Sequence, residues 1–527
     1  MRHLPYIVGA FMLLDRRRQR KKTPDPHNAL SDCATAALAE VCHQIWLLKN
    51  VLWWYLLPLA VPMLVFFAFS SANLPGPAPL QFFGFLVISG IVAGIYAGIY
   101  WLNQWAVKKD LEPRRQELAK LLAELEPNTP PPLMKTHKPL APLILVIVVC
   151  GLSLLDAFGR LITQNEDVRP SASASDPTSQ LLEAIRLKHR FPALAAAVVV
   201  DGKVVTTNAV GFRKHGGDEA ATPLDKFHIG SVTKSMTATI AAMLVEQGKI
   251  DWTTTVGEAL AKDANPIHPD YRGVTLEQLL AHRGGAPANA PRDLWRQAWK
   301  AVGTPAEQRR EFVRGLLARQ PETPPDTKMV YSNQGYAIAG VMLERATGKP
   351  WEELMRTMLF QPLEMASAGF GAPAKPGEID QPWGHTRSLT AGITPKPPGP
   401  GADNPAAIGP AGTVHCSLPD LAKYALFHLA GERDGTDLLK PASFRKLHTA
   451  VGDKYALGWM AVERPWAGGR ALTHTGSNTM FFVVIWLAPE RNCAVIVATN
   501  IGGPDPEAAF RGCDEAAGKL IRQYFPK

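Results

Sequence analysis

Ser231 and Lys234 form a pair that could carry out nucleophilic chemistry. They lie in the segment FHIGSVTK, residues 227–234, which opens an apolar helical pattern. Residues three apart on a helix share one face, so the lysine amine can reach the serine hydroxyl. An amine held there could take the hydroxyl proton and activate a nucleophile that is weak at neutral pH. The alternative is an ordinary N-cap serine followed by a solvated lysine, and the S-x-x-K spacing alone does not decide between the two.

Two later segments add partners for this pair. Tyr331, Ser332 and Asn333 open a helical pattern that starts 100 residues beyond Ser231, and the segment HTG at 474–476 ends a strand-like run. These three elements, in this order, resemble the S-x-x-K, Y-x-N and K/H-T-G set of the serine β-lactamases and penicillin-binding proteins. The resemblance covers roughly residues 178–523. Further segments are similar to the branch of class C β-lactamases and D-Ala-D-Ala carboxypeptidases: LLAHRGG at 279–285, GPAGT at 409–413, LPDL at 418–421 and YALGW at 455–459.

The resemblance implies roles for the serine and lysine of the first motif and for the tyrosine and asparagine of the second. Ser231 would attack a carbonyl carbon and form an acyl-enzyme. Lys234 and Tyr331 would share the proton transfers, with Tyr331 the family's usual candidate for passing a proton to the leaving group. Which of the two acts as the base stays open. Asn333 would bind a substrate amide and orient Lys234.

The resemblance also implies a substrate-binding strand. His474 and Thr475 would face a carboxylate or its equivalent, and Gly476 would let the substrate approach the backbone. The oxyanion hole would consist of the backbone N–H groups of Ser231 and Ser477. Loss of one such donor typically lowers the rate by about 10²–10³-fold. No metal or organic cofactor is required by this chemistry.

Two departures from the family pattern bear on the substrate. His474 stands where a potent class C β-lactamase has lysine, which disfavours β-lactam hydrolysis and predicts a site charge that is sensitive to pH near neutrality. The sequence after HTG, SNTMF at 477–481, lacks a further glycine that many relatives have. We therefore expect bulky side chains near the entrance of the site.

In residues 177–527, the sequence pattern predicts strands near both ends and helices in the middle. Apolar runs at 193–200 and 204–210 flank Asp201-Gly202, a strong hairpin signal. A matching pair of runs at 481–487 and 493–499 lies near the C-terminal end. The pattern predicts an α+β domain whose antiparallel sheet is assembled from both termini and flanked by helices beside a helical region. The resemblance implies a β-lactamase/transpeptidase-like fold for this domain, which follows a small-residue linker at 159–176.

The first third of the chain predicts three membrane spans within residues 52–158. Runs at 52–69 and 80–102 contain no charge, and a shorter run lies at 139–155. Each approaches the roughly 20 residues that a membrane-spanning helix needs, although a pair of buried core helices is the alternative. Residues 1–50 hold eight Lys and Arg, the 71–79 connection holds none and the 103–138 loop holds seven. The positive-inside rule then places 1–51 and the loop in the cytoplasm and the catalytic domain on the outer, periplasmic side of the inner membrane.

The charge distribution argues against a nucleic-acid partner, and the cysteine spacing argues against a metal site. The net charge of +9 is spread over both parts of the chain, because residues 1–176 hold 17 basic against 13 acidic residues. That distribution argues against a nucleic-acid partner and in favour of a lipid bilayer beside the basic run at 16–22. Three cysteines in the catalytic domain, Cys416, Cys493 and Cys513, have no metal-site spacing and are predicted to be buried thiols.

The sequence therefore predicts a membrane-anchored serine hydrolase that forms an acyl-enzyme on Ser231. Its substrate would be an amide or ester, such as a D-amino-acid peptide or a small acyl ester, outside the cytoplasmic membrane. Two alternatives remain: a true β-lactamase, and a non-catalytic sensor or binding module with a penicillin-binding fold. No protein partner is indicated.

Overall fold

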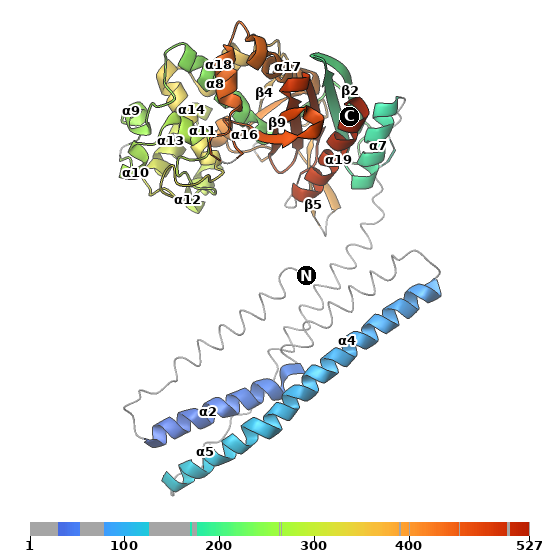
Figure 1. Ribbon diagram of the computed structural model, residues 1–527, viewed down its shortest axis with the longest axis vertical. Helices are drawn as coiled ribbons and strands as arrows, with labels where there is room; N and C mark the ends of the chain where they lie inside the picture. Colours follow the sequence, from blue (N-terminus) through green and yellow to red (C-terminus); the bar gives the residue numbers. More distant parts are fainter. Residues whose placement is uncertain are drawn as a thin grey trace. The chain divides into compact units, whose positions relative to one another are not determined.

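The computed structural model describes residues 30–52, 78–125, 169–170 and 176–525, apart from 263, 265, 389–391, 400, 453 and 503–505. The chain divides into two compact units, Met1–Gln164 and Asn165–Lys527 (Figure 1).

The first unit contains α2 (Leu30–Lys49) and a long helical stretch. That stretch consists of α4 (Ala78–Ala106), a π-helical turn η2 (Val107–Leu111) and α5 (Glu112–Leu125). Val41 and Ile45 of α2 pack with Val107 in a small apolar cluster. Lys49 Nζ lies 2.9 Å from Glu112 Oε1 and links the ends of α2 and α5.

The predicted transmembrane helices are wrong. Within the residues that the structure describes, no helix is both long enough and apolar enough to cross a membrane. The predicted span 80–102 falls in α4, whereas 139–155 and all of 52–69 except Leu52 lie outside the described residues. The prediction rested on the absence of charge in these runs, and the described helices do not combine the length and apolarity that a span requires. The predicted multi-pass location in the inner membrane is contradicted with it.

The second unit is built on a six-stranded antiparallel sheet, and the predicted α+β domain is confirmed. The strand order is β2-β1-β11-β10-β9-β8, so strands from both ends of the unit meet at the centre. Asp201 and Gly202, with φ of 50° and 73°, form the predicted tight turn between β1 and β2. The strands are β1 (Ala193–Val200), β2 (Lys203–Gly211), β8 (Met460–Arg464), β9 (Gly469–Ser477), β10 (Phe482–Ala488) and β11 (Cys493–Thr499).

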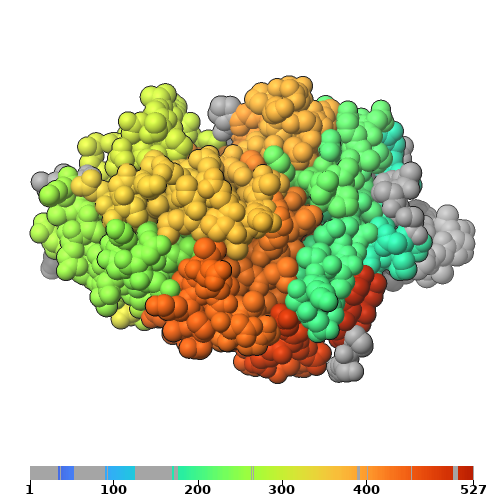
Figure 2. All heavy atoms as spheres, turned by 90° about the horizontal axis from the view of Figure 1, so that it is seen from above, coloured from blue at the N-terminus to red at the C-terminus, as the bar shows by residue number. Residues whose placement is uncertain are grey.

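Both faces of this sheet are covered, because alternate residues of β1 enter different apolar clusters. Leu194, Ala196 and Val198 pack with α7 (Pro177–His189) and α19 (Pro506–Tyr524). These two helices come from opposite ends of the unit and lie side by side in Figures 1 and 2. The intervening residues of β1 pack on the other face of the sheet with the helical region; they are Ala193, Ala195, Ala197 and Val199. Side chains alternate along a strand, so a continuous apolar run can serve two cores.

The helical region and two small sheets carry the remaining elements. Figure 1 shows most of these helices grouped to one side of the sheet. The helices are α8 (Thr233–Glu246), α9 (Val256–Leu260), α10 (Pro269–Arg272), α11 (Leu276–Leu280), α12 (Arg292–Ala298), α13 (Pro305–Leu317), α14 (Asn333–Thr347), α15 (Trp351–Leu354), α16 (Gly409–Gly412), α17 (Leu418–Asp434) and α18 (Pro441–His448). Short helical turns are η3 (Gly230–Val232), η4 (Met355–Phe360), η5 (Ala406–Ile408), η6 (Pro465–Ala467) and η7 (Pro489–Arg491). The small sheets are β3 (Lys226–His228) with β7 (Val414–Ser417) and β4 (Gly369–Phe370), and β5 (Gly384–Ser388) with β6 (Gly392–Lys396).

The three cysteines of this unit are buried free thiols, as predicted. Burial raises the pKa of the Cys416 and Cys513 thiols above the ordinary value. In the part of the chain that the structure describes, no cluster of His, Cys, Asp and Glu side chains is arranged to hold a metal ion.

Candidate active site

Ser231 lies in the η3 turn that joins β3 to α8. Gly230 precedes it with φ of +49°, a conformation that glycine adopts without strain. The N-cap of α8 is Val232, and no side chain caps this helix. The interpretation of Ser231 as an ordinary N-cap is therefore wrong, and its hydroxyl is available to other partners.

Lys234 points from the first turn of α8 to the Ser231 hydroxyl. Its Nζ donates to Ser231 Oγ at 3.0 Å, to Asn333 Oδ1 at 2.7 Å and to the Ala411 carbonyl at 2.8 Å. The residue is fully buried, so it is not a solvated surface lysine. Burial lowers the pKa of the Lys234 amine well below its ordinary value, because the charged form loses its hydration.

The start of α14 supplies Asn333 and, just before it, Tyr331. Ser332 is the N-cap: its Oγ accepts from the Gly335 N–H at 3.2 Å and donates to the Pro287 carbonyl at 2.7 Å. These bonds fix the turn, so that Asn333 reaches Lys234 from one side while the Tyr331 ring lies 4.9 Å from Lys234 Nζ on the other. Desolvation raises the pKa of Tyr331 to about 12, and the hydrogen bond with Ser231 opposes that shift.

His474 lies on β9 with both ring nitrogens engaged. Nδ1 is 2.6 Å from the Thr475 carbonyl, and Nε2 is 3.1 Å from the Tyr455 hydroxyl. A carbonyl can only accept, so the proton is on Nδ1 and Nε2 accepts from Tyr455. Burial, together with the positive charge of Lys234, lowers the pKa of His474 to about 3. The predicted change of charge near neutral pH is wrong, because the buried ring stays neutral there.

The end of β9 packs directly on the η3 turn. A Cβ atom on Gly230 would lie 2.2 Å from Ser477 N, and one on Gly476 would lie 1.9 Å from the Ile229 carbonyl oxygen and 2.8 Å from Ser231 N. Side chains at either glycine would separate the two backbones. The glycines therefore allow the backbone at Ser231 and the backbone at Ser477 to approach each other closely. Thr475 is half-buried.

The residues after the HTG segment differ from the sequence expectation. Met480 and Phe481 are buried, and Asn478 Oδ1 accepts their backbone N–H groups at 3.1 and 3.0 Å. Only Thr479 is exposed at this turn, with φ of +72°. The bulky side chains therefore pack inward and do not narrow the entrance as predicted.

The model of the beta-lactamase family matches residues 174–516, which is more than half of the chain. The chain belongs to the beta-lactamase family. Membership makes it a serine hydrolase of the β-lactamase and penicillin-binding-protein fold, and the family resemblance read from the sequence is confirmed.

Two sequence relatives and one solved structure agree with this assignment. The chain is 28% identical over 332 residues to penicillin-binding protein 4 of Amycolatopsis lactamdurans, covering 61% of this chain and 84% of that protein. It is 28% identical over 363 residues to unguisins hydrolase of Aspergillus campestris, covering 64% of each, so it spans less than two thirds of that relative. The octameric penicillin-binding protein homologue from Pyrococcus abyssi shares the fold, with a TM-score of 0.55, 23% identity, and coverage of 66% of this chain and 78% of that one.

His282 belongs to this beta-lactamase-family site, although the sequence pattern indicated it only as part of the segment LLAHRGG. Its ring centroid lies 4.4 Å from that of Tyr331, 4.6 Å from Tyr455 and 5.2 Å from Tyr336. Its Nδ1 accepts the Ser332 N–H at 3.1 Å, and its backbone has φ of +60°, which is unusual for a residue other than glycine. Burial lowers the pKa of His282 well below the ordinary value. A neutral His282 thus supports the Tyr331 ring from behind.

Buried polar side chains hold the rear of α8. Tyr424 OH donates to Ser235 Oγ at 3.1 Å, and Thr239 Oγ1 lies 3.3 Å from His428 Nε2. His428 Nδ1 is 2.8 Å from His448 Nε2, which lies on α18. This chain of contacts fixes α8 on the face that carries Ser235 and Thr239.

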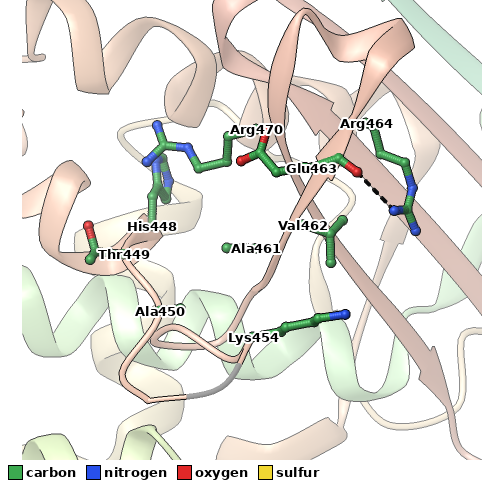
Figure 3. Close-up of a pocket in the computed structure, with 9 residues that line it drawn as sticks. All are labelled: His448, Thr449, Ala450, Lys454, Ala461, Val462, Glu463, Arg464 and Arg470. Atoms are coloured by element: carbon green, nitrogen blue, oxygen red, sulfur yellow. Dashed lines mark hydrogen bonds between the residues drawn. The ribbon is translucent and has the colours of Figure 1, made fainter.

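His448 also lines a cavity of about 590 Å³, and its Nδ1 is 2.7 Å from Glu432 Oε2. Figure 3 shows His448 and the basic side chains of Lys454, Arg464 and Arg470 around this cavity. None of the predicted site residues lines it. The cavity is therefore separate from the Ser231 site.

Proposed function

We propose that this serine hydrolase cleaves an amide or ester through an acyl-enzyme on Ser231, with a D-amino-acid peptide or a small acyl ester as the substrate class. The observation that carries the proposal is the buried Lys234 amine, 3.0 Å from the Ser231 hydroxyl. A serine in this setting has its proton acceptor in place before substrate arrives.

In the first step Lys234 acts as the base. A neutral amine donates to only two acceptors, and Asn333 Oδ1 and the Ala411 carbonyl occupy both. In this neutral form the lone pair faces the Ser231 hydroxyl, so the hydrogen bond that the charged amine donates to Oγ is reversed. The proton moves to Nζ as Oγ attacks the carbonyl carbon. The lowered pKa of Lys234 supports this assignment, because the neutral form is accessible well below the pH at which a solvated lysine loses its proton.

Two further groups complete the acylation step. The N–H groups of Ser231 and Ser477 would stabilise the negative charge on the carbonyl oxygen. Tyr331, whose pKa is raised to about 12, keeps its proton at neutral pH, donates it to the leaving amine or alcohol, and is restored by the proton that Lys234 took from Ser231. Water then attacks the acyl-enzyme and gives one proton to Lys234, and that proton returns to Ser231 Oγ as the acid leaves.

The neutral state of His474 supports the choice of substrate. Potent class C β-lactamases have a lysine at this position, whereas here the ring has no charge and both nitrogens are engaged. A carboxylate on the substrate would gain no charge–charge attraction from it. The names of the two relatives, a penicillin-binding protein and an unguisins hydrolase, agree with acyl transfer.

The test uses the full-length protein and its Ser231→Ala variant. We expect a fluorescent fluorophosphonate to label the wild type and not the variant. We also expect p-nitrophenyl acetate or a D-alanyl p-nitroanilide to turn over faster than the cephalosporin nitrocefin. Rapid nitrocefin hydrolysis would instead establish a β-lactamase. Equal labelling of both proteins, or labelling of neither, would overturn the enzyme assignment in favour of a binding module.

A further inference from the structure

His228 lies beneath the nucleophile turn, three residues before Ser231, and is completely buried on β3. Its Nδ1 accepts the backbone N–H of Gly230 at 3.1 Å. A ring nitrogen that accepts a hydrogen bond carries no proton, so the proton of the neutral ring must be on Nε2. The bond to Gly230 therefore exists only in one of the two neutral tautomers of His228.

Asp403 selects that tautomer. Its Oδ1 lies 2.6 Å from His228 Nε2, and its side chain is 11% exposed. In the described part of the chain, neither atom has a partner in hydrogen-bond geometry, so their 2.6 Å contact acts as an electrostatic pair. A carboxylate facing one ring nitrogen keeps the proton on that nitrogen. Asp403 thus leaves Nδ1 free to accept from Gly230.

The loop that carries Asp403 contacts the two other backbone segments of the site. Asn404 Nδ2 donates to the Gly412 carbonyl at 2.7 Å, next to the Ala411 carbonyl that accepts from Lys234. On its other side, the Ala402 carbonyl accepts from Asn478 Nδ2 at 3.5 Å, and Asn478 follows Ser477. Residues 402–404 therefore contact all three segments that present backbone groups to the reaction.

Gly230 needs such a restraint more than any other residue in the turn. It has no Cβ, its φ is +49°, and it directly precedes the proposed Ser231 N–H donor. A small rotation at Gly230 would tilt the following peptide and point that N–H away from Ser477. The hydrogen bond from Gly230 N to His228 holds the peptide on one side of this flexible residue.

We propose that His228 and Asp403 are positioning residues for the oxyanion hole: Asp403 fixes the tautomer of His228, and His228 fixes the Gly230–Ser231 backbone. The inference rests on the proposed function, because it assigns a purpose to the same site. Neither side chain contacts the reacting atoms.

Two replacements of His228 separate its two nitrogens. In His228→Asn the amide oxygen takes the place of Nδ1 and can still accept from Gly230, but nothing reaches Asp403. In His228→Gln the amide nitrogen takes the place of Nε2 and can face Asp403, but Gly230 loses its acceptor. The second-order rate constant for fluorophosphonate labelling of Ser231 and the melting temperature are measured for both. We expect the Asn variant to stay within about fivefold of the wild-type rate and the Gln variant to fall at least about tenfold, which is part of the 10²–10³-fold effect of losing an oxyanion donor.

His415 provides the matched control. It lies opposite His228 on β7, is also buried, and its Nδ1 contacts the Gly371 carbonyl rather than the turn. His415→Gln should lower the melting temperature but leave the labelling rate within about threefold, since full loss of a donor has far larger effects. If His228→Gln does not fold, Asp403→Asn, which keeps an oxygen acceptor, should label faster than Asp403→Ala.

The outcomes distinguish this inference from the proposed function. No Ser231-dependent labelling in the wild type would overturn both. Normal labelling of the wild type, with equal rates in the Asn and Gln variants or rates that follow the melting temperatures alone, would overturn the positioning role and leave the hydrolase assignment intact.

Discussion

Gly230→Ala should impair acylation far more than it impairs folding. An alanine at φ of +49° carries a steric penalty of roughly 1–2 kcal/mol. Its Cβ would also lie 2.2 Å from the backbone nitrogen of Ser477, and no side-chain rotation can relieve a contact between two backbones. The end of β9 must therefore move away from the η3 turn. Because Ser477 N–H is one of the two proposed oxyanion donors, this movement removes it from the site.

The expected loss follows from that displacement. Removal of one oxyanion donor lowers the rate by about 10²–10³-fold, equivalent to about 2.7–4 kcal/mol of barrier. The measurement is the second-order rate constant for fluorophosphonate labelling, with the free energy of unfolding determined by urea on the same preparation. Phosphonylation develops negative charge on an oxygen in the same position, so it reports on the same donors.

Gly248→Ala is the matched control for backbone strain. Gly248 has φ of +66°, and a Cβ there would meet nothing within 4 Å. It should lose a similar 1–2 kcal/mol of stability and keep its labelling rate. If the two variants lose stability equally and both label within about twofold of wild type, β9 does not deliver a donor to this site and the reasoning from the Gly230 contact fails.

Two further predictions concern titration. Lys234→Arg should lower the labelling rate by at least about 10³-fold, because a guanidinium stays protonated and cannot take the Ser231 proton. In the wild type, the labelling rate should rise with pH and level off well below the pH at which a free lysine amine titrates. A labelling rate that keeps rising to pH 10 would contradict the lowered pKa of Lys234. The second prediction is that folding is sensitive to acid. Burial lowers the pKa of His385 and His415 to about 4 and of His474 to about 3. The stability that these neutral buried rings contribute is therefore complete above the unfolded pKa of about 6.5 and is lost as pH falls from 6.5 toward 4. Each pKa unit corresponds to about 1.4 kcal/mol per site; urea unfolding at pH 7, 6 and 5 measures the slope, and stability that does not change over this range would refute it.

The sequence predicted the elements whose signals are local. Asp201-Gly202 between two apolar runs predicted the β1–β2 hairpin, because both residues must adopt positive φ and that pair does so readily. The helical pattern predicted to open at residues 331–333 appears as α14 (Asn333–Thr347). The predicted helix from Ser231 begins later, at Thr233, because Gly230 and Ser231 form a tighter turn first. The membrane spans were predicted from uncharged runs alone, and no described helix has the length and apolarity of a span.

What the sequence alone determined about the site is the short-range relation between Ser231 and Lys234. In a helical turn, a spacing of three residues brings two side chains to the same face because of the backbone geometry, so this relation could be predicted from the spacing. The tertiary structure decided what that pair can do. Lys234 obtains its acceptors from Asn333 and Ala411, 99 and 177 residues away, and its pKa falls only because packing excludes water. The neutral state of His474 and the contact between His228 and Asp403 arise in the same way. A pKa and a tautomer depend on the solvent and charges around a group, and those are set by residues that only the folded chain brings together.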